Sequence, residues 1–327
     1  MKELIALFSK QLREAITIGE STLLPSPTLS FSQIVVSGLG GSGIGASIVQ
    51  EYVYDSLSIP FTVNKNYFIP ASTDANTLFI ACSYSGNTEE TLMAVKDAKK
   101  RNATIVCITS GGELASFAKK NNFPLFLIPS GMPPRACLGY SLVQLLFVLN
   151  RYKLIKLAVR KEIESAASML DVETKKVQKQ AQKISAQLVG KQIAIYGMAG
   201  AEGLAIRFRQ QLNENSKVLC WHHVVPEMTH NEIVGWKHER PDMAVLFCYH
   251  AGDYERNIRR MGVLKKVVKQ CKATCIDIEA KGATYWQRVF FFIHLSDWVS
   301  VFLADAYQHD AVEVKVIDKL KSEMSKK

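Results

Sequence analysis

Short apolar runs alternate with longer segments whose apolar residues recur at helical spacing along this chain of 327 residues. Residues 33–53 are "QIVVSGLGGSGIGASIVQEYV", which predicts a buried strand, a glycine loop and the start of a helix. The same order returns at residues 191–212 as "KQIAIYGMAGAEGLAIRFRQQL". Strands rich in valine, isoleucine and phenylalanine that alternate with helices predict parallel sheets covered by helices on both faces.

A second pair of segments indicates an internal duplication. The segment "LFIACSYSGNTEET" around Gly86 matches "AVLFCYHAGDYERN" around Gly252, and both follow the first pair in the same order. The number of residues between the two glycine loops is nearly equal to the number between Gly86 and Gly252, as a duplication requires. We therefore predict an α/β protein with two doubly wound parallel-sheet domains.

The helical pattern suggests how the domains are arranged along the chain. We assign residues 1–150 to the first domain, residues 151–190 to a helical connection and residues 191–327 to the second domain, which ends in a C-terminal helix. The first residues, "MKELIALFSKQLREAI", form an amphipathic pattern rather than that of a signal peptide. Apolar runs stay short of the roughly 20 residues that a membrane span needs. We expect a cytoplasmic protein without a membrane partner.

Charge and cysteine content narrow the classes of partner. The net charge is +10, which favours anionic partners such as nucleic acid or small phosphates. The lysines are scattered over what look like solvated helix faces and do not alternate with aromatic residues, so we do not expect nucleic acid binding. Seven cysteines do not suggest a disulfide framework, and Cys271 and Cys275 lack a second ligand pair for zinc.

Small polar residues gather where two strands of the first copy end, and the hydroxyls are lost in the second copy. The candidates in the first copy are Gly41, Ser42, Ser83, Ser85 and Thr88. The four hydroxyl residues correspond to Ala201, Tyr249, Ala251 and Tyr254 in the second. Glycines and hydroxyls that open a helix after a parallel strand form a site for an anion, because backbone N–H groups and the helix dipole point toward the ligand. We predict a phosphate site in the first domain only.

Two other interpretations of these loops are possible. Helix capping accounts well for one such hydroxyl, but less well for three together and a fourth, Ser42, in a separate glycine loop. A dinucleotide site would need the G-x-G-x-x-G spacing and an acidic residue for the ribose. The loop "GLGGSGIG" fits that spacing loosely, and no acidic residue follows near position 60. Both alternatives are less favoured than a phosphate site.

Four further motifs carry a family resemblance. They are "MPPRACLGYS" (132–141), "QQLNENSK" (210–217), "PEMTHNEIVGW" (226–236) and "VIDKLK" (316–321). Together with the serine loops they resemble the bifunctional phosphoglucose/phosphomannose isomerase family, which is built from sugar isomerase (SIS) domains. The resemblance implies a homodimer without metal or cofactor. It also implies isomerisation of hexose 6-phosphates, in which glucose 6-phosphate and mannose 6-phosphate are converted to fructose 6-phosphate through a cis-enediol.

The resemblance also assigns catalytic roles. Glu214 is expected to be the base, Arg135 to stabilise the enediolate and contact the phosphate, and His230 to open the sugar ring from the partner subunit. Lys319 is expected to line the site, with Lys321 as the alternative. From the residues alone, Glu214 would be an exposed helix-terminal glutamate. For Arg135 a surface arginine is the alternative, but the two prolines before it stiffen the backbone and disfavour that alternative. The reaction needs an acid/base, a carboxylate and a cation, which these residue types supply.

A zinc site is the competing interpretation of one histidine-rich string. His222, His223, Glu227 and His230 occur within "HHVVPEMTH", and some mannose-phosphate isomerases are zinc-dependent. The string is not an HExxH motif, and the predicted fold is α/β rather than β-barrel. We therefore interpret His222 and His223 as the polar end of a strand.

The C-terminal tail departs from the family. Members carry a Pro-Thr-Pro-like segment whose threonine contacts the substrate, and Val312 stands about where that threonine belongs. This difference affects the choice between glucose and mannose. Two other functions share these domains: non-catalytic phosphosugar sensing, and isomerisation of another sugar phosphate. The set of Arg135, Glu214 and His230 favours a hexose-phosphate isomerase over both.

Overall fold

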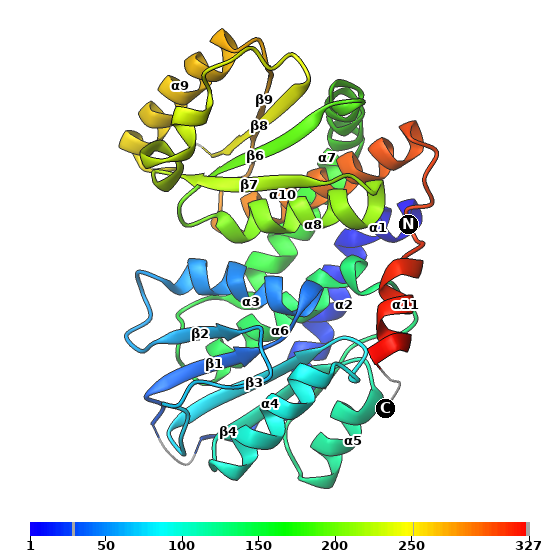
Figure 1. Ribbon diagram of the computed structural model, residues 1–327. Helices are drawn as coiled ribbons and strands as arrows, with labels where there is room; N and C mark the ends of the chain where they lie inside the picture. Colours follow the sequence, from blue (N-terminus) through cyan, green and yellow to red (C-terminus); the bar gives the residue numbers. More distant parts are fainter. Residues whose placement is uncertain (28–29, 251, 325–327) are drawn as a thin grey trace. The chain divides into compact units, whose positions relative to one another are not determined.

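The computed structural model describes residues 1–27, 30–250 and 252–324 and divides into two compact units (Figure 1). We call Ala6–Val172 with Gly282–Phe290 the N-terminal lobe. The C-terminal lobe comprises Met1–Ile5, Glu173–Lys281 and Phe291–Lys327. The predicted boundaries at residues 150 and 190 remain predictions.

The N-terminal lobe contains a five-stranded parallel sheet. Its strands are β1 (Gln33–Ser37), β2 (Phe61–Asn64), β3 (Thr77–Ser83), β4 (Thr104–Thr109) and β5 (Leu125–Leu127). Their order is β2-β1-β3-β4-β5. Every residue of β1 and β3 is buried, as expected for parallel strands covered on both faces. The continuous apolar runs of the sequence therefore correspond to the central strands.

Helices cover both faces of this sheet (Figure 1). The helices of this lobe are α2 (Phe8–Ser21), α3 (Gly40–Val53), α4 (Glu89–Lys100), α5 (Gly112–Lys120), the 3-10 helix η1 (Pro134–Ala136), α6 (Leu138–Arg151) and the first part of α7 (Val159–Leu188). Helices α4 and α5 pack on one face through a core that includes Phe79, Val95 and Leu114. The amphipathic N-terminal segment is helical as predicted, and Phe8, Leu12 and Ile16 of α2 are buried, whereas Leu7 between α1 and α2 is exposed.

The C-terminal lobe repeats the arrangement with four strands. They are β6 (Gln192–Met198), β7 (Cys220–Val225), β8 (Met243–Tyr249) and β9 (Thr274–Glu279). The order β7-β6-β8-β9 is the order of β2-β1-β3-β4 in the other lobe, and all pairs are parallel. This agreement confirms the predicted pair of α/β sheets.

The helices of the C-terminal lobe follow the same plan. They are α1 (Lys2–Ala6), the second part of α7, α8 (Glu202–Ser216), the 3-10 helices η2 (Glu227–His230) and η3 (Glu232–Gly235), α9 (Glu255–Gln270), α10 (Tyr285–Ala306) from Phe291 onward, and α11 (Lys315–Met324). The residues of α10 before Phe291 belong to the N-terminal lobe. Helix α9 packs through Met261, Leu264 and Val268 on the sheet. All seven cysteines are free, and Cys82, Cys107 and Cys248 are buried as predicted.

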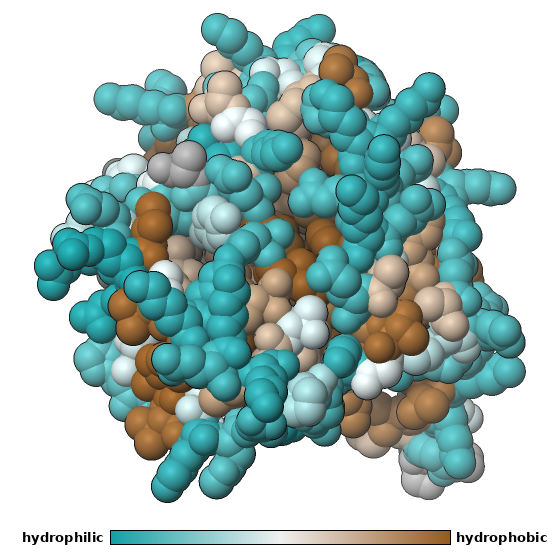
Figure 2. All heavy atoms as spheres, turned by 90° about the horizontal axis from the view of Figure 1, so that it is seen from above, coloured by the Kyte–Doolittle hydropathy of each residue, from teal (hydrophilic) through white to brown (hydrophobic). Residues whose placement is uncertain are grey.

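Helix α10 is longer and more apolar than we predicted from the apolar runs of the sequence. By length and composition it could cross a membrane, with a mean hydropathy of 1.5 over its most apolar window, but 83% of that window is buried in the protein. In the view of Figure 2, hydrophilic side chains cover most of the surface and hydrophobic ones form separate patches. Helix α10 therefore has the burial of a core helix.

Candidate active site

The two predicted phosphate loops open at neighbouring strand ends of the N-terminal lobe. Strands β1 and β3 pair directly, with Ser37 opposite Ala81 near their carboxyl ends. Helix α3 begins at Gly40, shortly after β1, and α4 begins at Glu89, shortly after β3. The loop between β3 and α4 needs glycine at position 86. The φ of Gly86 is +70°, and a Cβ there would lie 1.9 Å from the Gly111 carbonyl oxygen. This is the edge at which α/β sheets bind ligands.

Hydrogen bonds in and between these segments orient the hydroxyls of Ser85 and of Ser42, which lies in the first turn of α3. The oxygen of Ser42 accepts from the N–H of Tyr84 at 3.2 Å, and that of Ser85 accepts from the N–H of Asn87 at 3.2 Å. A hydroxyl that accepts in this way keeps its proton to donate to a ligand. Ser85 is exposed at the loop surface. The loop geometry therefore suits donation to an anion.

Ser83 and Thr88 form a different arrangement. Ser83 is only 2% exposed, and its oxygen accepts from the N–H of Gly86 at 3.1 Å. Its hydroxyl also lies 2.9 Å from that of Thr88. Because Ser83 is enclosed, its visible role is to hold the loop, while the partly exposed Thr88 lies at the loop surface.

Capping does not explain these hydroxyls. Thr88 is the N-cap residue of α4, but its side chain makes no capping bond and pairs with Ser83 instead. The N-cap residue of α3 is Leu39, which has no polar side chain. The first backbone N–H groups of both helices are therefore not satisfied by the side chain of their own N-cap residue, an arrangement that suits anion binding.

Arg135 lies on η1 in the same lobe, close to the first phosphate loop. A Cβ at Gly41 would be 3.1 Å from the carbonyl oxygen of Pro134, so the glycine lets the start of α3 approach η1 closely. The amide of Gln11 donates to the carbonyl of Ala136 at 2.8 Å. Arg135 itself is 5% exposed. Arg135 is therefore a buried cation beside the loops that we predict to bind phosphate, which excludes the alternative of a surface arginine.

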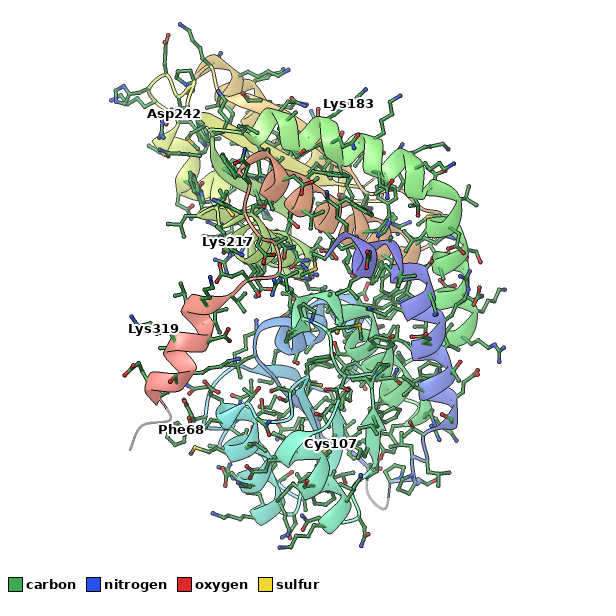
Figure 3. The ribbon with its side chains drawn as sticks, turned by 90° about the vertical axis from the view of Figure 1, so that its right-hand side faces the viewer. Phe68, Cys107, Lys183, Lys217, Asp242 and Lys319 are labelled. Atoms are coloured by element: carbon green, nitrogen blue, oxygen red, sulfur yellow. The ribbon has the colours of Figure 1, made fainter. Side chains whose placement is uncertain are left out.

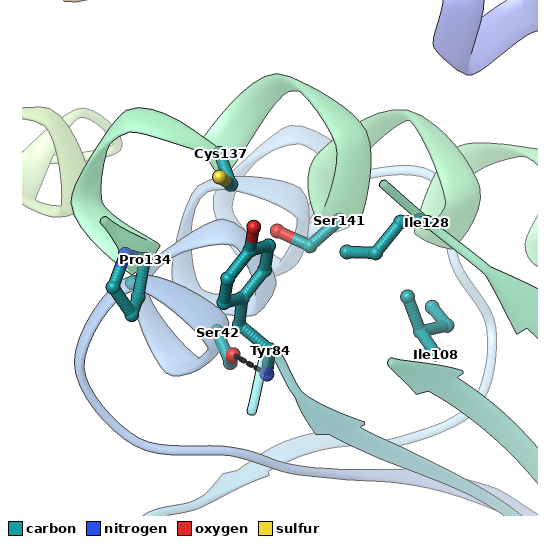
Figure 4. A pocket seen from close by; sticks show the side chains of 8 residues that line it. Ser42, Tyr84, Ile108, Ile128, Pro134, Cys137 and Ser141 are labelled. Atoms are coloured by element: carbon teal, nitrogen blue, oxygen red, sulfur yellow. Dashed lines mark hydrogen bonds between the residues drawn. The ribbon is translucent and has the colours of Figure 1, made fainter. Parts of the chain in front are cut away.

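Tyr84 connects these loops and was not predicted from the sequence. Its hydroxyl accepts from the N–H of Met132 at 3.1 Å, while its own N–H donates to Ser42. Figure 4 shows its ring between Pro134, Cys137 and Ser141. Burial raises the pKa of the Cys137 thiol to about 11, with the Tyr84 hydroxyl acting in the opposite direction. That thiol is therefore neutral at pH 7 and is not an activated nucleophile.

Glu214 occupies the last turn of α8 in the C-terminal lobe and is half-buried. The side chain of Asn215 donates to the hydroxyl of Ser300 at 2.9 Å, and Ser216 donates to the carbonyl of Ser300 at 2.6 Å. Asn213 donates to the carbonyl of Val218 at 2.7 Å. Glu214 therefore stands at a helix end, as predicted, between polar neighbours that fix the backbone.

His230 ends η2 in the C-terminal lobe, and its side chain is exposed. The turn is anchored by the fully buried Met228 and by Thr229, whose hydroxyl accepts from Arg260 at 3.2 Å. An exposed imidazole on a held turn is consistent with a role toward a molecule outside the lobe.

Lys319 and Lys321 both lie on α11, and both are exposed. Figure 3 shows Lys319 on this helix, and the structure does not favour one lysine over the other. Val312 precedes the helix, is 46% exposed and donates its N–H to the Asp310 carboxylate at 2.8 Å.

The structure thus brings the serine loops and Arg135 together within the N-terminal lobe. Glu214, His230, Lys319 and Val312 belong to the C-terminal lobe. Within that lobe, the Lys217 ammonium donates to the carbonyls of Glu214 at 2.6 Å and Glu313 at 2.7 Å. The end of α8 is therefore tied to the segment that contains Val312.

The histidine-rich string does not form a ligand cluster. His222 lies 3.6 Å from the Glu202 carboxylate, and the Nδ1 atom of His223 accepts from the N–H of Val224 at 2.8 Å. Glu227 accepts from the side chain of Asn231. Across residues 1–27, 30–250 and 252–324, no group of three or more His, Cys, Asp or Glu side chains could hold a metal ion. Of the second-copy positions compared above, Ala251 lies outside the described residues.

Comparisons with known proteins agree with the family resemblance. A model described as "Bacterial phospho-glucose isomerase C-terminal SIS domain" matches residues 177–324, and a SIS domain model matches residues 30–126. A bifunctional phosphoglucose/phosphomannose isomerase from Caldicellulosiruptor bescii is 38% identical over 336 residues, which cover 99% of each chain. The enzyme of that name from Aquifex aeolicus is 33% identical over 90% of this chain and 91% of its own.

The solved structures extend the likeness to the fold. The C-terminal domain of glucosamine-fructose-6-phosphate aminotransferase from Francisella tularensis superposes with a TM-score of 0.76. The match covers 96% of this chain and 98% of that domain, at 14% identity. At that identity the likeness concerns the arrangement of the two sheets and their helices.

Proposed function

The chain belongs to the bifunctional phosphoglucose/phosphomannose isomerase family, and on that premise we propose that it converts glucose 6-phosphate and mannose 6-phosphate to fructose 6-phosphate through a cis-enediol. It is a hexose-phosphate isomerase. The proposal extends this class of reaction to particular substrates, a mechanism and a set of residues.

We assign the substrate phosphate to the two loops of the N-terminal lobe. The supporting observation is that the exposed Ser85 and the nearly buried Ser42 have oxygens that accept backbone N–H groups. Their protons remain for phosphate oxygens, and the adjoining helix N-termini add backbone donors and a favourable dipole. Neutral donors of this kind bind a phosphate dianion without requiring many buried charges.

We assign the proton transfer to Glu214. The carboxylate would remove the proton from C2 of the open-chain aldose while the C1 carbonyl becomes the enediolate oxygen. The proton of the C2 hydroxyl would pass to the C1 oxygen. Glu214 would then return the proton it holds, or one exchanged with solvent, to C1 as the C2 oxygen becomes the ketone. A base must be aimed at one position throughout, and the anchored residues on either side of Glu214 support this assignment.

Arg135 would stabilise the negative charge that develops during that step, and His230 would act on the ring hydroxyl of the substrate. Arg135 carries a permanent charge and is held at 5% exposure, which suits stabilisation of a developing oxyanion. The exposed imidazole of His230 would exchange the ring hydroxyl proton of a substrate bound by the partner subunit of a homodimer. Lys319 would add a further cation near the substrate.

The match of the whole chain to a bifunctional isomerase carries the proposal. A proton NMR time course with glucose 6-phosphate and, separately, mannose 6-phosphate tests it, with a chelator present in both. We expect fructose 6-phosphate to accumulate from either substrate, and we expect no product from the Glu214→Gln variant. If neither substrate were converted by the unmodified protein, the proposed function would be wrong.

A further inference from the structure

The end of α8, which carries Glu214, is closed by a lysine. Lys217 follows the last residue of the helix in the left-handed conformation, with a φ of +58°, and its N–H donates to the carbonyl of Leu212. Its ammonium donates to the carbonyl of Glu214 at 2.6 Å. The last four carbonyls of a helix lack a partner within the helix. Lys217 therefore supplies one to the residue proposed as the base.

The same ammonium reaches the C-terminal tail. It donates at 2.7 Å to the carbonyl of Glu313, one residue after Val312. A further bond joins the same two segments. The Nδ1 atom of His309 lies 2.8 Å from the carbonyl oxygen of Ser216, and that nitrogen is the donor because a carbonyl can only accept. We call these three bonds, two from Lys217 and one from His309, the α8 clamp.

Other contacts hold α8 from its buried side. Earlier in the helix, Arg207 forms an ion pair at 3.0 Å with Asp297 of α10, and both residues are buried. Asn215, which is also buried, bonds to Ser300 of α10. Glu214 is half-buried and lies in the last turn, where helices open most readily. The α8 clamp acts on this turn from the exposed side, so the backbone of Glu214 is held from both sides.

Other helix ends of this chain are built differently. Lys272 follows α9 with the same left-handed φ of +58° and is also exposed, but its ammonium pairs with the carboxylate of Glu239 at 2.5 Å. Helix α3, which matches α8 in the first copy, is followed by Tyr54 in the right-handed conformation. Of these three helix ends, as far as the described residues show, a lysine bonds both its own helix and the tail in the one that carries Glu214.

We propose that Lys217 is a positioning residue, which holds the backbone of Glu214 and the tail next to Val312 in one fixed arrangement during proton transfer. The inference rests on the proposed function of Glu214 as the base. A base that moves a proton between neighbouring carbons must stay within reach of both, and small displacements of such a group lower the rate strongly. The bonds of Lys217 go to two backbone carbonyls, so it acts on the position of Glu214.

Lys217→Gly is the decisive variant. Glycine adopts the left-handed conformation without strain, so the backbone at position 217 keeps its shape while both ammonium bonds are lost. We expect a Tm close to that of the unmodified protein, a kcat with fructose 6-phosphate that is about tenfold lower, and little change in KM. Thermal unfolding and steady-state kinetics measure these values. A purely structural role would instead lower Tm and leave the kcat of the folded enzyme unchanged.

Two further variants test the bonds and the site of the change. Lys217→Arg keeps donors for two carbonyls, so we expect its kcat to lie within about threefold of that of the unmodified protein. Lys272→Gly is the matched control, because it makes the same change at an exposed left-handed lysine of the same lobe. This control should leave kcat and KM unchanged.

The outcomes separate this inference from the proposed function. An active unmodified enzyme whose kcat is unchanged in Lys217→Gly would overturn the positioning role alone, whereas full activity of Glu214→Gln would refute the base itself. An equal fall of kcat in Lys272→Gly would also overturn the positioning role. If Lys217→Gly did not fold, Lys217→Met and Lys217→Arg would decide. A low kcat in Lys217→Met that Lys217→Arg restores supports the role, and equal values of kcat refute it.

Discussion

The hydroxyl oxygen of Tyr84 accepts a hydrogen bond from the backbone N–H of Met132 at 3.1 Å. Tyr84 lies between the two serines of the second phosphate loop, whereas Met132 lies three residues before Arg135. The bond therefore joins the proposed phosphate site to the loop that carries Arg135, the residue proposed to stabilise the enediolate. Both loops belong to the N-terminal lobe, so their relationship does not depend on the other lobe.

Loss of this bond should affect catalysis more than phosphate binding. Tyr84→Phe removes the bond from Met132 together with the interaction between the Tyr84 hydroxyl and the Cys137 thiol, and it leaves the ring in place. One neutral hydrogen bond is worth about 0.5–1.5 kcal/mol. We expect kcat to fall by a factor of about 3 to 10 while competitive inhibition by inorganic phosphate stays nearly unchanged. Steady-state kinetics with and without phosphate measure both effects.

Tyr140→Phe is the control for that experiment. Tyr140 is buried in the same lobe, and its hydroxyl bonds to Glu14 rather than to the Arg135 loop. Tyr140→Phe should lower Tm without lowering kcat. An equal loss of kcat in both variants would mean that Tyr84 has no special connection to Arg135.

The serines of the second loop should differ in their effects. Ser85→Ala removes an exposed donor and should raise KM several-fold with little change in kcat, because the phosphate is gripped equally in the ground and transition states. Ser83→Ala removes an enclosed hydroxyl that bonds Gly86 and Thr88, so it should lower Tm as well. The double variant should raise KM far more than it lowers kcat.

Ser116→Ala provides the matched control for the two serines. Ser116 lies on the surface of α5 and donates only to its own helix, at the carbonyl of Gly112. We expect Ser116→Ala to have the KM, kcat and Tm of the unmodified protein, as measured by steady-state kinetics and thermal unfolding. A fall in kcat alone in Ser85→Ala would contradict the phosphate assignment.

Glu214→Gln should abolish exchange of the C2 proton with solvent while fructose 6-phosphate still binds. The amide keeps the size of the side chain but cannot accept the proton as a carboxylate does. Deuterium incorporation followed by NMR measures exchange, and calorimetric titration measures binding. Glu202→Gln, at the other end of α8, should exchange normally. Parallel loss of binding and exchange in Glu214→Gln would make Glu214 a structural residue.

The proposed homodimer leads to a complementation experiment. Glu214→Gln and His230→Ala proteins should each be inactive, yet a mixture should regain activity as subunits exchange. A mixed dimer would contain one site with both groups intact, and on random exchange the recovered activity should approach about a quarter of normal. Native mass spectrometry confirms exchange. Exchange without recovery would place His230 in the site of its own subunit or outside the reaction.

The sequence predicted the sheets because parallel strands buried on both faces are continuous apolar runs. It predicted small polar loops at two neighbouring strand ends because glycine and serine gather there, and their role in binding phosphate stays a prediction. It could not predict the separate roles of Ser83 and Ser85, since burial at alternate loop positions depends on tertiary packing. Asp297 left a usable signal, a lone acid in the apolar run "FFFIHLSDWVSVFLA", but its partner Arg207 is 90 positions away. Tyr84 left no signal, because nothing in the chain marks its contact with Met132.

The last prediction concerns Val312 and the choice between the two aldoses. Glucose 6-phosphate and mannose 6-phosphate differ only at C2 and give the same enediol, so a site that uses both must let the substrate rotate about the C2–C3 bond. The segment containing Val312 is tied to the end of α8 through Lys217, which bonds the carbonyls of both Glu214 and Glu313. A threonine near position 312 could hold a substrate hydroxyl during that rotation, whereas valine has the same shape and no donor. One neutral hydrogen bond contributes about 0.5–1.5 kcal/mol, or roughly a threefold to tenfold effect on rate.

We therefore expect kcat/KM to be higher for glucose 6-phosphate than for mannose 6-phosphate, and Val312→Thr to narrow the difference. Val314→Thr, two residues further along the same segment, is the control that should leave the ratio unchanged. The ratio is obtained from initial rates of fructose 6-phosphate formation from each aldose. Equal use of both sugars by the unmodified enzyme would show that Val312 does not impose a preference. If Val312→Thr left an existing preference unaltered, the determinant of epimer choice would lie at another position, because a hydroxyl at position 312 would then have no effect on the reaction.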